Sequence, residues 1–147
     1  MNVLITGGAG YIGSVTAELF LNNKHNVIIY DDLSTGFLKL VDKRAKFVKS
    51  SILNYKKLVE TFKKYKVQAV VHLAAKIVVP ESVAKPFEYF QTNVNGTMNI
   101  LKAMNECKVN KIIFASSAAI YGNVKKVPIS EDSPKNPINP YGQTKLI

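Results

Sequence analysis

The sequence is poor in cysteine, in acidic residues and in long apolar runs. Cys107 is the single cysteine, so no internal disulfide can form, and a cytoplasmic protein is expected. No apolar run approaches the roughly 20 residues that a membrane-spanning helix needs. Residues 1–10 lack the basic start of a secretory signal. Neither His25 nor His72 has cysteine or carboxylate partners at metal-ligand spacing, so no metal site is predicted.

The shortage of acidic residues gives the chain a strong positive charge. Ten Asp and Glu stand against twenty Lys and Arg, for a net charge of +10. Half of the basic residues fall within 39–66, where Asp42 and Glu60 are the only acids. This run is either a nucleic-acid surface or a lysine-rich solvated face that a partner or further chain balances. All its cations but Arg44 are lysines, and the segment has no aromatic interleaving suited to base stacking, which favours the solvated face and predicts no nucleic-acid partner.

Apolar runs alternate with helical patterns along the whole chain. Parallel strands need helical crossovers, so this alternation predicts an α/β fold with helices on both faces of a parallel sheet. Strands are predicted over residues 3–6, 27–30, 46–49, 69–73 and 111–115. Helices are predicted over 11–22, from a cap at Asn54 to about Tyr65, and as one long helix from Pro86 through Met104. Met98 and Met104 are predicted as core, the proline-rich segment 127–140 as a loop, and a last helix begins at Tyr141.

A glycine-rich turn joins the first predicted strand to the first helix. Its glycines fit two frames, Gly7-x-x-Gly10-x-x-Gly13 and Gly8-x-Gly10-x-x-Gly13. In either frame one glycine permits the tight turn, one lets the backbone approach a pyrophosphate, and Gly13 lets the helix pack closely on the strand. The positive end of the helix then faces the phosphates. The turn therefore predicts a dinucleotide site.

Two acids end the second predicted strand, eighteen residues after the turn. Asp31 and Asp32 stand where a carboxylate can accept hydrogen bonds from the adenosine ribose hydroxyls. A carboxylate there also repels a 2′-phosphate, so NAD is favoured over NADP. Asp-Asp-Leu-Ser is in addition good turn chemistry, which is the structural alternative for Asp31. With the acids in register with the glycine turn, the ligand-binding interpretation is favoured.

Five separated segments resemble the extended short-chain dehydrogenase/reductase family. They are ITGGAGYIGS, the DDLS turn, HLAAKIVVPESVAKPFEYFQTNVNGT, FASSAAIYG and PYGQTK, and they keep the family's order over almost the whole chain. Within that family, residues 73–97 are most similar to the UDP-glucose 4-epimerases. The resemblance implies a Rossmann-type doubly wound parallel sheet of about five strands in the order 3-2-1-4-5.

The resemblance assigns catalytic roles to Tyr141, Lys145 and Ser117. Tyr141 and Lys145 form the Tyr-x-x-x-Lys motif, whose spacing places both side chains on one face of a helix. A neighbouring ammonium and the positive nicotinamide ring would help a tyrosine to act as a base near neutral pH. Ser117 matches the Ser or Thr that hydrogen-bonds the sugar 4-hydroxyl. The motif alone recurs by chance on amphipathic helices, and it gains weight from the nucleotide turn and the serine-rich strand end.

The residues after Ser117 separate two reactions of this family. The related sugar-nucleotide dehydratases carry an acid directly after the hydroxyl, whereas this chain has Ala118 and Ala119. Epimerisation or simple redox chemistry is therefore favoured over elimination of water. The resemblance implies NAD-dependent epimerisation at C4 of a nucleotide-sugar of the UDP-glucose type, through transient oxidation to a 4-keto sugar.

Further cofactor contacts carry over from the family with three departures. Ser51-Ile52 stands where an acid commonly contacts adenine, a lysine lies at Lys76 rather than at Ile77, and Thr92 precedes Asn93. The predicted cofactor-binding residues are Gly7, Gly10, Tyr11, Ile12, Gly13, Asp31, Asp32, Ser34, Ser51, Ile52, Leu73, Ala74, Ala75, Asn93, Tyr141 and Lys145.

Family members are longer than this chain. The resemblance thus implies that residues 1–147 form an NAD-binding Rossmann domain, cut short before the last strands and a C-terminal substrate domain. The UDP-sugar would then bind only to the full-length form, and the chain alone is expected to be inactive. A non-catalytic nucleotide-binding or scaffold protein, or another sugar-nucleotide epimerase or reductase, is the alternative. Family members often pair through their helices, which leaves a homodimer open.

Overall fold

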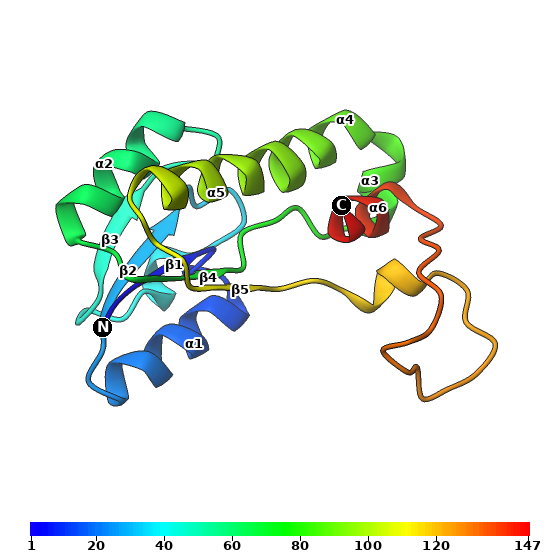
Figure 1. Cartoon of the computed structure of the whole chain (residues 1–147), viewed down its shortest axis with the longest axis horizontal. Helices are drawn as coiled ribbons and strands as arrows, with labels where there is room; N and C mark the ends of the chain where they lie inside the picture. The colour runs from blue at the N-terminus through cyan, green and yellow to red at the C-terminus, as the bar shows by residue number, and fades with distance from the viewer. The chain divides into compact units, whose positions relative to one another are not determined.

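A five-stranded parallel sheet forms the centre of the first part of the chain (Figure 1). The computed structural model describes all of residues 1–147. The strands are β1 (Asn2–Thr6), β2 (Asn26–Asp31), β3 (Lys46–Lys49), β4 (Ala69–His72) and β5 (Ile112–Phe114). Their order is β3-β2-β1-β4-β5, and every neighbouring pair is parallel. The predicted Rossmann-type order 3-2-1-4-5 is confirmed.

The register of the sheet places the ends of three strands at one level. Thr6 at the end of β1 pairs with Tyr30 of β2 and with His72 of β4. The segments that follow these strands, which begin at Gly7, Asp32 and Leu73, therefore leave the sheet at the same carboxyl edge. Ligands of open parallel sheets bind at this edge.

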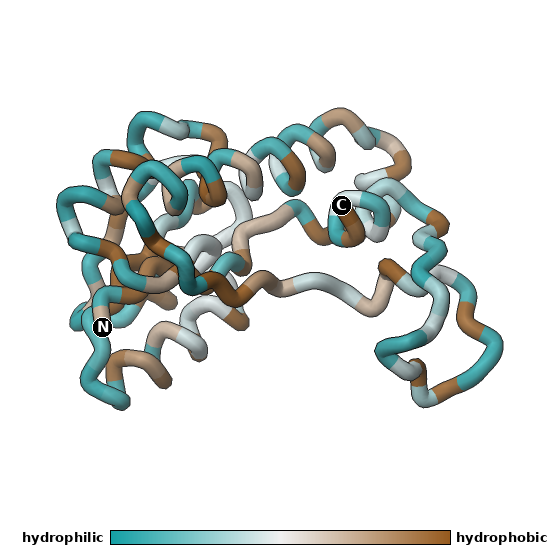
Figure 2. The backbone as a smooth tube through the Cα atoms, in the orientation of Figure 1, coloured by the Kyte–Doolittle hydropathy of each residue, from teal (hydrophilic) through white to brown (hydrophobic).

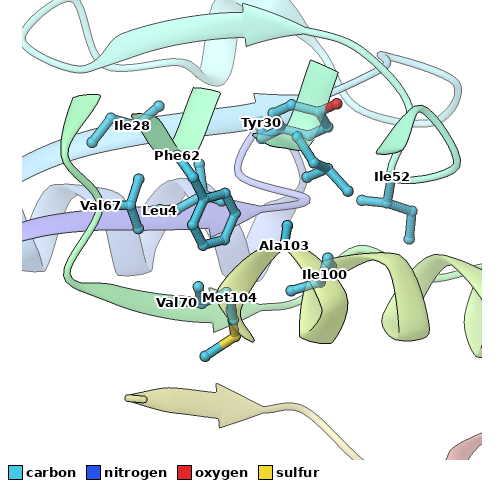
Figure 3. Close-up of a cluster of buried hydrophobic side chains, with 11 residues drawn as sticks. Leu4, Ile28, Tyr30, Ile52, Phe62, Val67, Val70, Ile100, Ala103 and Met104 are labelled. Atoms are coloured by element: carbon cyan, nitrogen blue, oxygen red, sulfur yellow. The ribbon is translucent and has the colours of Figure 1, made fainter. Parts of the chain in front are cut away.

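Helices cover both faces of the sheet in this part of the chain. The helix α1 (Tyr11–Asn22) packs on one face, and α2 (Tyr55–Tyr65) and α5 (Gly96–Glu106) pack on the other. Figure 3 shows the larger of the two apolar clusters, in which Leu4 and Val70 of the sheet meet Phe62 of α2 and Ile100 of α5. Figure 2 shows the apolar residues that run along the strands between these helices. Burial of these side chains is the main favourable contribution to folding.

Two helix faces are exposed where apolar periodicity favours burial. The apolar residues Ile12, Val15 and Leu19 of α1 are more than half exposed, because the small residues Gly13 and Ala17 face the sheet instead. Met98 is 52% exposed and does not belong to the core, so that prediction was wrong, whereas Met104 is buried as predicted.

The chain forms two compact units. The first comprises residues 1–74 and 96–115 and holds the sheet, and the second comprises residues 75–95 and 116–147. The second unit contains α3 (Val79–Ala84), α4 (Pro86–Tyr89), a π-helical segment η2 (Phe90–Asn95), the short 3-10 helix η3 (Ala118–Tyr121) and α6 (Pro140–Leu146). A further 3-10 turn, η1 (Leu38–Leu40), lies in the first unit. None of the helices combines the length and the apolarity that a membrane crossing requires.

Residues 86–106 are helical throughout, which confirms the predicted helix from Pro86 through Met104, and the one unpredicted detail is a π-helical turn inside it. The segment is divided into α4, the π-helical η2 and α5, and α3 precedes it. In η2 the buried side chain is that of Asn93, a polar residue that apolar periodicity does not detect. Single π-turns inside helical segments often accompany functional positions.

Candidate functional site

The glycine-rich turn after β1 requires glycine at both of its ends. Gly7 has a φ of +72°, and a Cβ on it would lie 2.7 Å from the backbone nitrogen of Ala74. A Cβ on Gly13 would collide with the carbonyl oxygen of Gly7. Gly8 is similarly close to the side chain of Ile29, at 2.7 Å. These glycines are therefore needed by the fold, because the turn packs against β2, against the segment after β4 and against the start of α1.

Gly10 differs from the other glycines of the turn. A Cβ on Gly10 would meet only the Gly7 carbonyl oxygen, at an ordinary contact distance of 3.4 Å. Gly10 is also the N-cap of α1, and no side chain caps this helix or places an acid in its first turn. The N–H groups of Tyr11, Ile12 and Gly13 consequently lack acceptors within the helix. Open space beside an uncapped helix start fits the binding of a phosphate group.

Asp31 connects the glycine turn to the end of β2. Its Oδ2 accepts a hydrogen bond from the backbone N–H of Ala9 at 3.0 Å, and its Oδ1 accepts from Leu33 at 2.8 Å. The side chain is buried, with 9% exposure. Asp32 is exposed, and its Oδ1 accepts from the N–H of Ser34 at 2.9 Å. These hydrogen bonds fit the turn interpretation of the Asp-Asp pair, and the ligand-binding interpretation stays a prediction.

The predicted pair after β3 has a mainly structural setting. Ile52 is 4% exposed and belongs to the core, where a Cβ on Gly96 would collide with its side chain. The Ser51 hydroxyl accepts from the N–H of Leu53 at 3.2 Å, and its carbonyl oxygen accepts from the Tyr30 hydroxyl at 3.2 Å. The side chain of Ile52 is therefore committed to packing.

The segment after β4 is fixed to β1 through Thr6. The N–H of Leu73 donates to the Thr6 carbonyl oxygen at 3.1 Å, and the N–H of Ala74 donates to the Thr6 hydroxyl at 3.4 Å. Buried His72 contacts two hydroxyls, with Nδ1 2.7 Å from Thr6 and Nε2 2.9 Å from Thr97. These two contacts indicate a structural role for His72.

The second unit carries the predicted catalytic motif on α6. Asn139 caps this helix by accepting a hydrogen bond from the N–H of Gly142 at 2.8 Å, and Pro140 occupies its first turn. Tyr141 is half-buried and Lys145 is 7% exposed. Burial lowers the pKa of Lys145 to about 8, because the charged form loses solvation.

Two contacts from other segments of the second unit hold α6. The Ser116 hydroxyl donates to the carbonyl oxygen of Lys145 at 3.2 Å. The side-chain amide of Asn93 donates to the Thr144 hydroxyl at 2.9 Å, and that hydroxyl donates to the Tyr141 carbonyl oxygen at 2.7 Å. Sequence reasoning missed Ser116 and Thr144 in this role, since no local pattern reveals a contact between segments far apart in the chain.

The short helix η3 brings the Ser117 segment against α6. The Ser117 hydroxyl accepts from the N–H of Ala119 at 3.2 Å and so caps η3. A Cβ on Gly142 would lie 2.6 Å from the Ala119 carbonyl oxygen, so glycine permits the close approach of η3 and α6. Both the serine-rich segment and the Tyr-x-x-x-Lys motif therefore belong to one packed region of the second unit.

Asn93 is buried between the segment after Ala75 and α6. Its Oδ1 accepts from the backbone N–H of Lys76 at 2.8 Å, and its amide donates to the Lys76 carbonyl oxygen at 3.0 Å. With the bond to Thr144, the side chain is fully engaged inside the protein. Asn93 thus links the chain after β4 to the helix that carries the catalytic motif.

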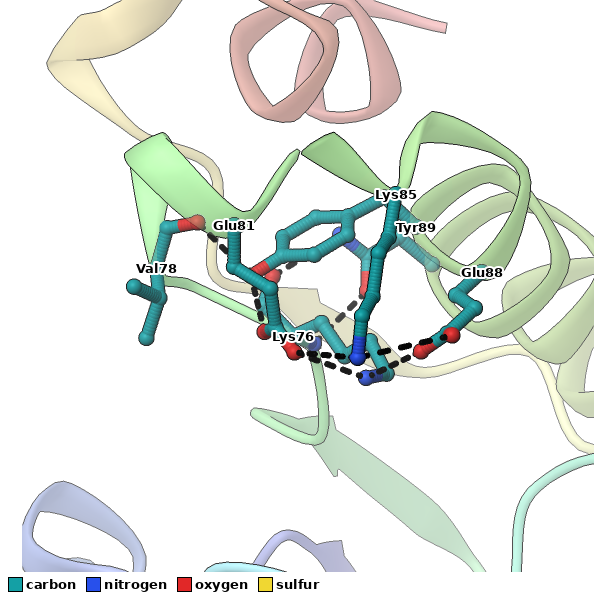
Figure 4. Close-up of polar contacts among 7 residues, drawn as sticks. Lys76, Val78, Glu81, Lys85, Glu88 and Tyr89 are labelled. Atoms are coloured by element: carbon teal, nitrogen blue, oxygen red, sulfur yellow. Dashed lines mark hydrogen bonds and ion pairs between the residues drawn. The ribbon is translucent and has the colours of Figure 1, made fainter. Parts of the chain in front are cut away.

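The side chain of Lys76 enters an ion-pair cluster (Figure 4). Its Nζ lies 2.9 Å from Glu88 and 3.7 Å from Glu81, and Lys85 contacts the same two carboxylates at 3.9–4.0 Å. The Glu88 hydrogen bond raises the pKa of Lys76, and Lys76 lowers the pKa of Glu88. The buried Tyr89 hydroxyl donates to Glu81 at 2.8 Å and lies 2.7 Å from the Val78 carbonyl oxygen. Lys76 is therefore engaged within the unit.

The predicted site residues are distributed over both units. The glycine turn, the acids, Ser34, Ser51, Ile52, Leu73 and Ala74 belong to the first unit. Ala75, Asn93, Ser117, Tyr141 and Lys145 belong to the second. In the first unit the glycine turn, Asp31 and Ala74 lie together at the start of α1, whereas Ile52 packs in the core with α2 and α5, and in the second unit the residues gather around α6.

Comparison with known proteins identifies relatives over the whole chain. The chain is 46% identical to UDP-glucose 4-epimerase of Lactobacillus helveticus over 147 residues, which is 44% of that protein. The solved structure of UDP-glucose 4-epimerase from Brucella ovis in complex with NAD matches with a TM-score of 0.95 and 46% identity, over 99% of this chain and 44% of that one. The epimerase from Thermotoga maritima with UDP-glucose gives a TM-score of 0.96 at 38% identity, over 99% and 48%.

These matches confirm the resemblance found in the sequence, and they set its extent. The chain spans about 44% of the length of the curated relatives it matches. The sequence pattern of one family, described as GDP-mannose 4,6 dehydratase, matches residues 4–147. Because that match covers nearly the whole chain, the protein belongs to the GDP-mannose 4,6 dehydratase family.

Proposed function

We propose that this chain binds NAD and supplies the cofactor-binding part of a UDP-sugar 4-epimerase. The observation that carries the proposal is the start of α1, where Gly10 leaves open space beside three backbone N–H groups without a capping side chain. Asp31 fixes the turn and offers its carboxylate to a ribose. The chain is similar to UDP-glucose 4-epimerases, of which several were crystallised with NAD.

The residues around α6 would perform the proton transfer at the sugar. In this proposal the Tyr141 phenol takes the proton of the C4 hydroxyl, and the Ser117 hydroxyl holds that oxygen. Lys145, protonated below its pKa of about 8, supplies the positive charge that favours a phenolate nearby. NAD, held by the glycine turn and Asp31, would supply the hydride acceptor and donor for the transient oxidation at C4.

Epimerisation is preferred to dehydration on the identity of two residues. Ala118 and Ala119 follow Ser117 in η3, and neither can donate a proton to a leaving hydroxyl. Elimination of water needs a general acid at that oxygen. The names of the relatives agree with this choice, although the family takes its name from a dehydratase.

Cofactor retention tests the binding part of the proposal. The purified chain is denatured, and the supernatant is examined for NAD by absorbance and chromatography, followed by titration of the refolded chain with NADH fluorescence. We expect saturable binding of one NAD per chain. If denaturation releases no NAD and the refolded chain does not bind added NADH, the chain is not an NAD-binding protein. A Gly10→Ala variant is the matched control, because it should fold and fail to bind.

Activity is tested separately, because the chain covers less than half of its relatives. We propose that the 147-residue chain alone does not interconvert UDP-galactose and UDP-glucose, since the substrate-binding part implied by the family lies outside it. Measurable interconversion by the purified chain would overturn this. NAD binding without activity in any longer form of the protein would favour the alternative, a non-catalytic nucleotide-binding protein.

A further inference from the structure

A cavity lies at the edge of the sheet opposite to the glycine turn. It has a volume of about 320 Å³ and is lined by the first residues of three strands, Asn2, Asn26 and Lys46. The last turn of α2 and the residue after it complete the wall with Lys64 and Lys66. Ligand pockets begin at about 300 Å³, so the cavity can accept a small molecule.

The lining of this cavity is basic and contains no acid. Arg44, Lys46, Lys64 and Lys66 are all among its residues. Arg44 is neutralised by Asp42, which accepts from its guanidinium at 2.7–3.1 Å. No ion pair engages the three lysines, and only the ring of Tyr65, 5.1 Å from the Lys64 ammonium, contacts one of them. Three uncompensated cations therefore share one hollow.

The backbone that carries these lysines is fixed. The Asn2 amide donates to the carbonyl oxygens of Tyr65 at 2.8 Å and Lys66 at 3.1 Å, and its Oδ1 accepts from the Asn26 amide at 2.9 Å. Lys66 has a φ of +48° and ends α2, and Lys46 is held in β3 by pairing with Ile28. A fixed backbone limits the space that the three ammonium groups can reach and so lowers the entropy cost of bringing them to one ligand.

We infer that this cavity binds a small polyphosphate anion, either free or as part of a nucleoside polyphosphate. Three lysines, one at the start of β3 and two at the end of α2, match several phosphate groups of one ligand better than a single phosphate. The only arginine of the lining is paired with Asp42, and the rings of Tyr65 and His25 are already engaged by Lys64 and Phe20, which disfavours a nucleic acid. The inference does not depend on the proposed function, because the cavity and the glycine turn lie at opposite edges of the sheet.

Calorimetric titration with inorganic tripolyphosphate at about 0.15 M salt tests the inference, because this ionic strength screens distant charges. The Lys64→Gln/Lys66→Gln variant should bind at least about tenfold more weakly, and Lys46→Gln about threefold more weakly, as expected for the loss of individual ion pairs in a shared site. The matched control is Lys125→Gln/Lys126→Gln, which removes the same charge from an exposed loop and should change the Kd less than about twofold. Equal losses in both double variants would overturn the inference, because net charge alone would then explain the binding.

Two further arms separate this cavity from other anion sites. Tripolyphosphate should bind with the same Kd when NAD is saturating, whereas displacement by NAD would place the anion at the glycine turn and overturn the inference. ATP should compete with tripolyphosphate if the ligand is a nucleotide, and leave it bound if the site accepts only the free anion. An RNA oligomer that binds more tightly than both would overturn the assignment of ligand class. If the Lys64→Gln/Lys66→Gln variant has a lower Tm and an unchanged Kd, these two lysines stabilise the C-terminal end of α2 and do not bind the anion, which would overturn the inference.

Discussion

At the scale of single residues, two glycines of one turn are constrained by different things. Gly13 is required by the protein itself, because a Cβ there would collide with the Gly7 carbonyl oxygen. Gly10 has room for a Cβ, so the fold gives no reason for glycine at that position. A ligand that must approach the backbone closely would require glycine at this position. The sequence pattern cannot make this distinction, since it contains only the spacing.

Substitution of these two glycines should therefore separate binding from stability. We expect Gly10→Ala to keep the free energy of unfolding within about 0.5 kcal/mol and to weaken NAD binding at least tenfold. Gly13→Ala should lose both stability and NAD binding. The destabilisation should be about 1–3 kcal/mol, because the new Cβ collides with the backbone. Chemical denaturation and NADH fluorescence titration measure the two quantities. Equal NAD affinity of Gly10→Ala and the unchanged protein would contradict the role given to the open space.

Lys145 is a buried cation whose charge opposes folding. Its pKa falls from 10.5 to about 8, a difference that corresponds to a destabilisation of about 3 kcal/mol at pH 7. Below pH 8 both the folded and the unfolded chain carry the proton, and the penalty is full. Between pH 8 and 10.5 the unfolded chain binds more protons, so stability rises with pH, and the penalty vanishes above that range. Such a residue is expected where function requires it.

The Lys145→Met variant should accordingly be more stable than the unchanged chain. We expect a gain of about 1–3 kcal/mol at pH 7, which shrinks toward zero near pH 10.5, because methionine fills similar space without a charge. Urea denaturation at pH 7, 8.5 and 10 measures this difference, with Lys125→Met in the exposed loop as the control that should show no gain. A gain that does not change with pH would mean that the charge of Lys145 is not its source.

At the scale of elements, local chemistry was predictable and contacts between distant segments were not. The cap at Asn54 follows from the residue type, and its side chain accepts from the N–H of Lys57 at 3.0 Å. The strands follow from short apolar runs. The face of α1 that packs on the sheet could not be predicted from the sequence, because its residues Gly13 and Ala17 carry too little apolar surface to produce a pattern. The π-helical turn in the helix after Pro86 was not predictable either. It accompanies buried Tyr89 and Asn93, whose hydrogen-bond partners lie in other segments of the chain.

The same contrast applies to the candidate site. The glycine turn, the Asp pair and the Tyr-x-x-x-Lys motif are local patterns, and the structure places each on the element expected for it. The supports of α6 are not local: Ser116 and Asn93 reach it from segments 29 and 51 residues away. A single sequence contains no signal for such pairs, because the residue type is the same whether the polar side chain is solvated in a loop or makes a buried hydrogen bond.

The cap of α6 gives a prediction at this scale. α6 has seven residues, too few to be stable without help, and the Asn139 side chain satisfies one of its free N–H groups. Asn139→Ala should destabilise the second unit by about 1 kcal/mol, and Asn139→Asp should retain most of the stability because its carboxylate also accepts. Amide hydrogen exchange of residues 141–147 measures the effect. Unchanged protection in Asn139→Ala would show that packing alone holds the helix.

At the scale of the whole molecule, one edge of the sheet and the net charge act in opposite directions. β5 pairs only with β4, and its residues Ile112, Ile113 and Phe114 are 37%, 61% and 39% exposed. An exposed apolar edge strand favours pairing with another chain. The net charge of +10 opposes such association, because like charges repel until salt screens them.

Self-association of the chain should therefore increase with salt and depend on β5. We expect sedimentation velocity to show weak, concentration-dependent association at 0.5 M NaCl and less at 0.05 M, since the screening length falls from about 14 to 4 Å over that range. Ile113→Lys should weaken association at least fivefold, because a charge on an edge strand blocks pairing. Val127→Lys adds the same charge at a side chain that is 76% exposed in a loop, and it should leave association nearly unchanged. If both variants weaken association equally, net charge governs it, and the edge of β5 has no part in it.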